Sequence, residues 1–174
     1  MDIRGKLQSL GQSELRERSA AYPFEIPYRL INMYSVYGDT VLDPFWGMGT
    51  TSLAAMVAGR SSIGYELDGE FVQLFEERVE ETPKYSREVL KQRLDNHEAF
   101  VQRRLREGDE FNYEADNYDF PVTTKQEKPI RFYSVSEVRR TDDGYEVTHE
   151  PVESTAVRAE ETDQADEITS LSDF

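Results

Sequence analysis

Two glycines and two carboxylates are spaced along the chain as a nucleoside-binding site requires. Asp43 ends the apolar run Val41-Leu42, and Gly47 and Gly49 follow in a short loop. Glu66 comes 19 positions after Gly47, at the end of the next apolar run. Glycines let a ligand approach the backbone, and a carboxylate about 20 residues further on accepts hydrogen bonds from ribose hydroxyls. The spacing therefore predicts a site for a nucleoside cofactor.

The residues around the glycines narrow the kind of cofactor. A dinucleotide-binding loop needs a third glycine three residues after Gly49, where this chain has Ser52. A phosphate-binding P-loop needs a lysine after its second glycine, and Thr50 stands there. A cofactor with a ribose and without a pyrophosphate remains, and S-adenosylmethionine is the obvious candidate. Two plainer interpretations stay open: the glycines form only a tight turn, or Glu66 is an ordinary solvated or capping carboxylate.

Helices and strands that could position these residues alternate along the chain. Apolar residues at three- and four-residue spacings predict helices with one buried face, and a run of small residues ended by Gly59 predicts a further helix. Short β-branched or apolar runs beside glycine or proline predict strands. The expected elements are a helix over 27–37, a strand over 40–43, a helix over 50–58, a strand over 61–65 and a helix from an N-cap at Asp68 to Val79. This order predicts an α/β unit with a parallel sheet.

The remainder of the chain has weaker patterns. Sparse apolar residues among charges predict a long helix, and alternation over 130–138 before the turn Asp142-Asp143-Gly144 predicts a β-hairpin. Low hydrophobicity and high charge predict a disordered end. The predicted division is a lead-in over 1–20, the α/β unit over 21–82, the long helix over 83–107, a loop and hairpin over 108–150 and an acidic disordered tail over 151–174.

Several of these runs also resemble a known family. The C-terminal part of DNA amino-methyltransferases, the N4-cytosine/N6-adenine modification methylases, has similar residues in the same order. The resemblance covers about residues 20–80 and implies a partial Rossmann-like fold that binds S-adenosylmethionine. The runs that carry it are Tyr22-Pro23-Phe24-Glu25-Ile26-Pro27-Tyr28-Arg29-Leu30-Ile31, Gly38 to Thr51, Ala54-Ala55, Gly59-Arg60 and Ile63-Gly64-Tyr65-Glu66.

The resemblance implies cofactor contacts for a set of residues. In this family the proline-containing segment and the Asp-Pro-Phe-x-Gly-x-Gly loop bind S-adenosylmethionine, and the acid after the second strand holds its ribose. Carried over by position, these roles fall on Tyr22, Pro23, Phe24, Asp43, Pro44, Phe45, Gly47, Gly49, Thr50 and Glu66. A histidine often found just before the proline segment is absent here. Trp46, in the same loop, either lines the pocket or fills the core.

The family's base-binding motif does not occur in the sequence. That motif, Asp/Asn/Ser-Pro-Pro-Tyr/Phe, bonds the target amino group and stacks on a flipped base. None of the seven prolines is adjacent to another. We therefore expect the chain to supply the cofactor-binding half of a site-specific DNA methyltransferase, with cytosine-N4 favoured over adenine-N6, and to be inactive without the other half. No catalytic residue and no metal ligand is assigned within the chain.

Two other functions stay open. A catalytically inactive remnant or protein-interaction module is one, because the long helix and a sheet left open at its edge both suit a chain that needs a partner. A methyltransferase acting on RNA or a small molecule is the other, and it would require catalytic residues within 84–150, where none stands out. The expected partners are DNA, through the complete enzyme, and a separate N-terminal catalytic and target-recognition polypeptide.

The charge is unevenly distributed. The 174 residues carry a net charge of −15, and residues 141–174 hold eleven acidic residues against Arg158 alone. Fifteen of the 20 basic residues are Arg. This acidic, Arg-rich composition resembles that of salt-loving archaea, where salt screens the self-repulsion. A mesophilic protein with an acidic tail is the alternative.

Composition also excludes several kinds of site. The chain has no Cys and two His, so disulfides, thiolate nucleophiles and Cys-based zinc sites are excluded. No stretch approaches the roughly 20 consecutive apolar residues of a membrane helix, and no apolar signal core follows the N-terminus. The sequence therefore predicts a cytoplasmic protein without membrane contact.

Overall fold

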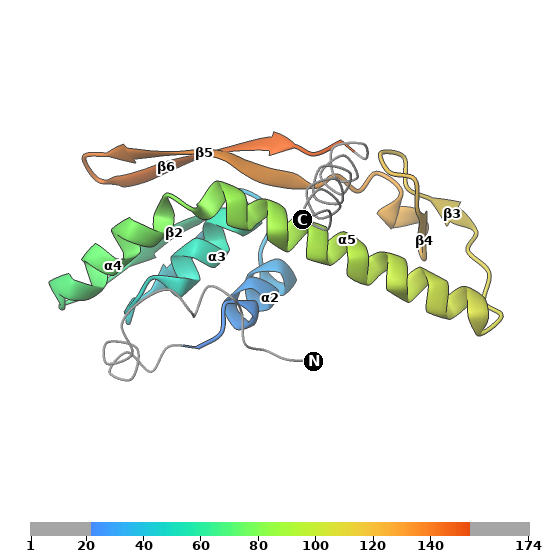
Figure 1. Ribbon diagram of the computed structural model, residues 1–174, viewed down its shortest axis with the longest axis horizontal. Coiled ribbons are helices and arrows are strands. Elements are labelled where there is room, and N and C mark those ends of the chain that lie inside the picture. Colours follow the sequence, from blue (N-terminus) through green and yellow to red (C-terminus); the bar gives the residue numbers. More distant parts are fainter. Residues whose placement is uncertain (1–21, 154–174) are drawn as a thin grey trace, which may run out of the picture. The chain divides into compact units, whose positions relative to one another are not determined.

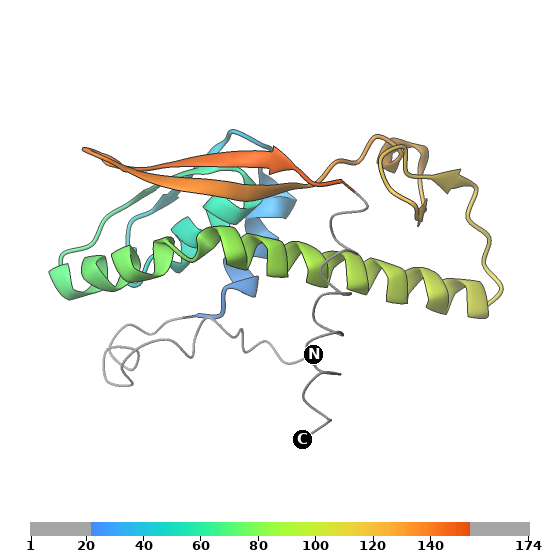
Figure 2. The ribbon, with the colours of Figure 1, turned by 45° about the horizontal axis from the view of Figure 1, so that its top comes forward.

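The computed structural model describes residues 22–153 (Figures 1 and 2). Within that range the chain divides into two compact units. The first unit comprises residues 22–86 and 135–149, and the second comprises 87–134 and 150–153. The predicted lead-in over 1–20 and the predicted tail beyond residue 153 lie outside the described residues.

The first unit alternates helices with short strands. Its elements are α2 (Glu25–Tyr34), β1 (Thr40–Asp43), α3 (Thr50–Ala58), β2 (Ser61–Gly64) and α4 (Gly69–Val79). β1 and β2 pair in parallel, with Thr40 opposite Ser61 and Asp43 opposite Gly64. The predicted parallel strands with flanking helices are therefore confirmed. Among the described residues this sheet contains these two strands alone.

The end of α2 differs from the prediction. The helix was expected to reach residue 37, but Ser35 is extended (φ −143°, ψ 166°) and the helix ends before it. Arg60, which follows α3, holds this end in place. Its Nε donates to Ser35 Oγ at 2.9 Å, a second guanidinium nitrogen donates to Ser35 O at 2.7 Å, and the Tyr37 ring lies 4.9 Å from the guanidinium carbon. Arg60 therefore anchors the connection between α2 and β1 to the start of β2.

The helices α3 and α4 carry the core of the first unit. All nine residues of α3 are buried, and Gly59 ends the helix in a left-handed conformation (φ +73°). α4 begins as predicted, because the Asp68 side chain accepts a hydrogen bond from Glu70 N. Phe75 and Val79 of α4 are buried with Leu53 of α3.

The helix α5 (Thr82–Arg106) continues from the first unit into the second, close to its predicted bounds of 83–107. The second unit has its own apolar cluster. It also contains three short elements that periodicity cannot reveal, because each is only two or three residues long. They are β3 (Tyr113–Glu114), β4 (Pro121–Val122) and the 3-10 helix η2 (Lys125–Glu127), with a cluster of Leu90, Ala115, Tyr118, Val122 and Phe132.

The predicted hairpin is present. β5 (Tyr133–Thr141) and β6 (Gly144–Pro151) form a two-stranded sheet around the turn Asp142-Asp143. Its residues in the first unit lie against α3 and α4 (Figures 1 and 2). The contacts are an edge-on ring pair between Tyr145 and Phe75 at 5.7 Å, a hydrogen bond from Arg140 to Glu76 Oε1 at 2.7 Å, and one between His149 Nε2 and Met56 O at 2.7 Å.

Packing in the second unit continues past the predicted boundary at residue 151. Val152 N–H donates to Phe132 O at 3.0 Å, and the Val152 side chain packs on the second unit's cluster. Across residues 22–153, no helix combines the length and apolar character needed to cross a bilayer.

Candidate functional site

The loop between β1 and α3 lies at the carboxyl end of the parallel strands, where open α/β sheets bind ligands. Asp43 ends β1, and Glu66 follows the end of β2. Tyr65 N–H donates to Asp43 O at 3.1 Å, and Trp46 N–H donates to Tyr65 O at 3.0 Å. These bonds tie the two strand ends together. The structure therefore brings the two predicted carboxylates to one edge of the sheet.

Glu66 holds the loop through backbone amides. Its Oε2 accepts from Gly47 N at 2.7 Å, and its Oε1 accepts from Leu67 N at 2.8 Å and from Asp68 N at 2.9 Å. These donors, Asp68 N–H foremost, hold the pKa of Glu66 below its ordinary value. Glu66 is thus a capping carboxylate, as the plainer interpretation had it. A carboxylate offers about four acceptor positions, so capacity remains for a ligand hydroxyl.

Tyr22 reaches the same edge from the segment before α2. Its hydroxyl bonds Thr51 Oγ1 and lies 3.5 Å from Asp43 Oδ2, while Asp43 Oδ1 accepts from Phe45 N at 3.1 Å. Burial, together with the negative charge of Asp43, raises the pKa of Tyr22. The Tyr22 hydroxyl therefore stays protonated at neutral pH and can donate.

The two loop glycines are required for different reasons. Gly47 and Gly49 both have positive φ, at +54° and +70°. A Cβ on Gly49 would overlap the Phe75 ring, whose Cε2 would lie 2.8 Å away, whereas no atom lies within 4 Å of a Cβ on Gly47. Packing of α4 against the loop explains Gly49. Gly47 presents open backbone that a ligand could approach.

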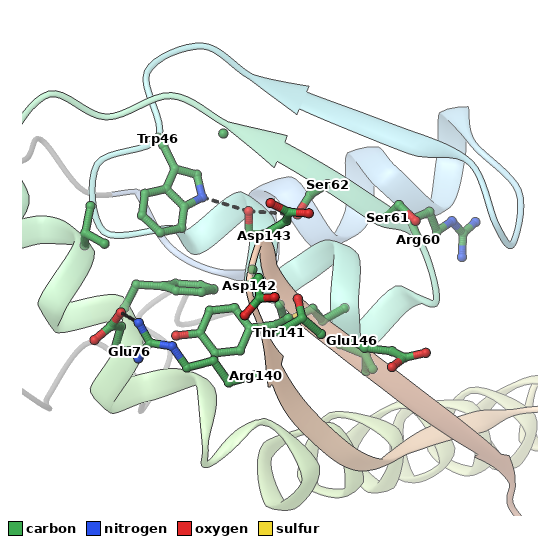
Figure 3. A pocket seen from close by; sticks show the side chains of 18 of the residues that line it. Trp46, Arg60, Ser61, Ser62, Glu76, Arg140, Thr141, Asp142, Asp143 and Glu146 are labelled. Carbon is green, nitrogen blue, oxygen red and sulfur yellow. Dashed lines mark hydrogen bonds and ion pairs between the residues drawn. The ribbon is translucent and has the colours of Figure 1, made fainter.

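Trp46 both packs and lines a cavity. Its Nε1 donates to Ser52 Oγ at 2.7 Å, and its ring lies 4.6 Å from that of Phe75. The cavity, of about 1050 Å³, opens between β2 and the hairpin tip with Asp142 and Asp143 (Figure 3). Trp46 is therefore half-buried against Phe75 and lines this cavity, and its contact with a cofactor stays a prediction.

The cavity and the predicted site coincide only in part. Of the ten residues predicted to contact a cofactor, Glu66 alone lines the cavity. Asp43 and the loop residues Pro44, Phe45 and Gly47 lie at the open edge of the strands, where Phe45 is 88% exposed. The predicted site is therefore an open edge, and Glu66 and Trp46 adjoin the cavity beside it.

The Phe24 side chain lies in the core of the first unit. Its ring is buried, stacked on Tyr28 at 5.4 Å and edge-on to Tyr85 at 4.7 Å. The Phe24 side chain therefore belongs to the core, and a cofactor contact at this position would have to come from its backbone. Thr50 is also buried, as the first residue of α3.

Sequence reasoning missed Arg78. This residue of α4 is buried, and one of its terminal nitrogens donates to Met48 O, in the glycine loop, at 2.7 Å. The signal was an arginine seven positions after Phe71 and three after Phe75, on the apolar face of the helix. Among residues 22–153, no three imidazole or carboxylate side chains gather as metal ligands.

The site combines a strand, a glycine loop, a helix and two carboxylates at one sheet edge. This combination is typical of a nucleoside-binding site in an α/β protein. Residues 6–77 match the profile of a family described as DNA methylase. This stretch of the chain is therefore similar to a segment of that family.

Individual relatives support this assignment. The chain is 53% identical over 132 residues to the type II methyltransferase M.MthZI of Methanothermobacter thermautotrophicus, covering 76% of this chain and 36% of that protein. It is 52% identical over 66 residues to the type II methyltransferase M.MjaI of Methanocaldococcus jannaschii, covering 38% and 22%. The chain thus spans about a third or less of the length of these relatives. The similarity to M.MthZI spans 132 residues, more than the matched segment 6–77 contains, so it continues past residue 77.

A solved structure is similar over a shorter stretch. A candidate DNA modification methylase from Thermus thermophilus, in complex with S-adenosyl-L-methionine, is 36% identical. The match covers 41% of this chain and 38% of that one, with a TM-score of 0.34.

Proposed function

We propose that this chain supplies the S-adenosylmethionine-binding part of a DNA amino-methyltransferase. One observation carries the proposal: Asp43, Gly47 and Glu66 meet at the carboxyl edge of a parallel strand pair, within the stretch that matches DNA methylases. The lack of a third loop glycine and of a P-loop lysine supports the choice of this cofactor over a dinucleotide or a nucleoside triphosphate.

The residues present fit this cofactor. Gly47 offers uncovered backbone, and Glu66 keeps acceptor capacity for ribose hydroxyls after binding three amides. Asp43 places a second carboxylate where a cationic amino-acid group would be attracted. Phe45 and Leu67 expose apolar side chains beside them. The bound cofactor would supply the methyl group, while these residues hold and orient it.

The acceptor half of the site would come from other residues. The Pro-Pro motif that binds a flipped base is absent from these 174 residues. The two type II methyltransferases that the chain resembles are much longer. We propose that residues outside this sequence, on the same or a separate polypeptide, bind DNA and the exocyclic amino group, with cytosine-N4 favoured over adenine-N6. No residue described here has a catalytic role in that scheme. The Arg-rich acidic composition supports a halophilic source.

An interaction module is the second candidate, and a surface feature favours it. Leu42 and Ile63 are opposite each other in the parallel register and are 62% and 51% exposed. Parallel sheets are normally covered on both faces. Either candidate therefore requires further polypeptide over this sheet face, but only the first requires the cofactor.

Calorimetric titration distinguishes the two. The chain should bind S-adenosylmethionine and its product S-adenosylhomocysteine, either alone or after addition of the polypeptide that carries the Pro-Pro motif. Absence of binding under both conditions would contradict the cofactor-binding proposal and favour the interaction module. The combined proteins should also transfer a labelled methyl group to DNA, and digestion to nucleosides would identify the modified base.

A further inference from the structure

The guanidinium of Arg78 is an unusual group to find beneath the glycine loop. Arg78 is only 8% exposed, and its Nε is buried without a hydrogen-bond partner among the described residues. No carboxylate among residues 22–153 forms an ion pair with it, and burial lowers its pKa, an effect that Tyr85 partly offsets. Burying a cation without a counter-ion is costly. A position that needed only packing would be better filled by an apolar side chain.

The hydrogen bond that Arg78 makes is to the loop. Its terminal nitrogen donates to Met48 O at 2.7 Å. Met48 lies between the two glycines with positive φ, so its flanking peptides have the least intrinsic preference for one conformation. A charge-assisted hydrogen bond is stronger than a neutral one, especially where water is excluded. Arg78 therefore fixes the orientation of the Met48 carbonyl, in the part of the loop with the greatest conformational freedom.

The neighbouring peptides of the loop are fixed by other groups. Gly47 N–H donates to Glu66, and Gly49 N–H donates to Trp46 O at 2.9 Å. The Phe75 ring, one turn before Arg78 on α4, packs against Gly49. The loop is thus held from the strand edge by Glu66 and from the helix by Arg78. Neither Phe75 nor Arg78 lies at the open edge where the cofactor would bind.

We propose that Arg78 is a positioning residue of the cofactor site, which holds the Met48 carbonyl so that the Gly47-Met48-Gly49 backbone is preorganised for S-adenosylmethionine. This inference rests on the proposed function. Preorganisation raises affinity because no part of the binding free energy is used to order the loop. If Arg78 has this role, replacing its side chain should weaken cofactor binding by more than it lowers the stability of the folded chain.

The test compares two buried arginines in the full chain. Arg78→Met keeps the volume and removes the donor, and Arg78→Lys keeps the charge with a single donor group. Arg60→Met is the matched control, because Arg60 is equally buried and also binds backbone carbonyls, but at the other end of α3. Calorimetry gives Kd for S-adenosylmethionine, thermal unfolding gives Tm, and amide exchange by NMR reports Met48 and Gly49.

Arg78→Met should weaken cofactor binding by about tenfold or more and speed exchange at Met48 and Gly49, with Arg78→Lys intermediate. Arg60→Met should lower Tm and leave Kd within about twofold. The proposal is overturned if Arg78→Met leaves both Kd and amide exchange unchanged, or if Kd follows Tm alike in both variants. If the wild-type chain binds no cofactor, either alone or with the polypeptide that carries the Pro-Pro motif, the proposed function fails. Unchanged exchange in Arg78→Met would then refute the positioning role separately.

Discussion

Glu66 has a structural role in the loop and a proposed role in binding the cofactor. Its two oxygens accept three backbone N–H groups, one from the glycine loop and two from the approach to α4. The carboxylate thus joins the segment after β1 to the segment after β2. A ligand hydroxyl bound at Glu66 would meet an acceptor that is already oriented.

Replacing Glu66 by Gln tests this double role. The amide has one acceptor oxygen, so its NH₂ group would face a backbone N–H that Glu66 now satisfies. We expect Glu66→Gln to weaken S-adenosylmethionine binding by about tenfold or more, the effect of losing a hydrogen bond to a charged group. Glu77→Gln, which neutralises an exposed carboxylate of α4, is the control for charge and should leave Kd unchanged. Equal Kd values for both variants would refute the assignment.

The titration of Glu66 is a second prediction at this scale. Backbone donors lower its pKa, so NMR of the side-chain carboxyl should give a midpoint below the ordinary 4.5. A carboxylate with a lowered native pKa contributes stability above its unfolded pKa, and that contribution is lost as the pH falls through the native value. The loop should therefore keep these hydrogen bonds until the pH falls through the lowered native pKa of Glu66. A midpoint at or above 4.5 would contradict the hydrogen bonds described.

The places of some residues around the glycine loop could be predicted from the sequence, and those of others could not. Asp43, Gly47 and Glu66 were predictable because a strand end and a glycine loop fix their places locally. Phe24 and Arg78 were not, because which side of a helix or turn faces the core depends on contacts with distant segments. Tyr85 covers Phe24 from α5, and the loop carbonyl accepts from Arg78 across 30 positions.

At the scale of elements, the glycine loop follows β1 and packs against α4. Substitution of its two glycines should therefore lower the free energy of unfolding by different amounts. Gly47→Ala places a Cβ in open space and should cost only the left-handed conformation, about 1 kcal/mol. Gly49→Ala adds a clash with Phe75, and we expect a total loss of about 3 kcal/mol. Urea unfolding measures both. Equal losses would mean that α4 does not pack against the loop as described.

Element prediction succeeded where apolar periodicity is long. α3, α4, α5 and the hairpin lie close to their expected bounds; α4 buries one face, whereas all nine residues of α3 are buried. The early end of α2 depends on Ser35 and on Arg60, which is 25 positions away, so local spacing could not reveal it. The short elements β3, β4 and η2 have too few residues for any periodicity, and the contacts of the second unit define them instead.

At the scale of the whole molecule, the charge of −15 predicts a strong response to salt. Raising KCl from about 0.1 to about 2 M shortens the Debye length from about 10 Å to under about 3 Å, which removes most repulsion between exposed acids. We expect Tm to rise over this range if the composition reflects a halophilic source. A chain ending at residue 153 separates the tail's charges from those of the two units. A Tm independent of salt would favour the mesophilic alternative.

Trp46 is the single tryptophan of the chain, and it lies in the glycine loop with its ring on Phe75 and its Nε1 on Ser52. Its fluorescence therefore reports on one place only, without any introduced label. Emission should shift when the loop changes its contacts, whether through a ligand, acid or a substitution at Arg78, while unfolding confined to the second unit should leave the spectrum unchanged. The molecule thus carries an optical probe at the segment on which its proposed function depends.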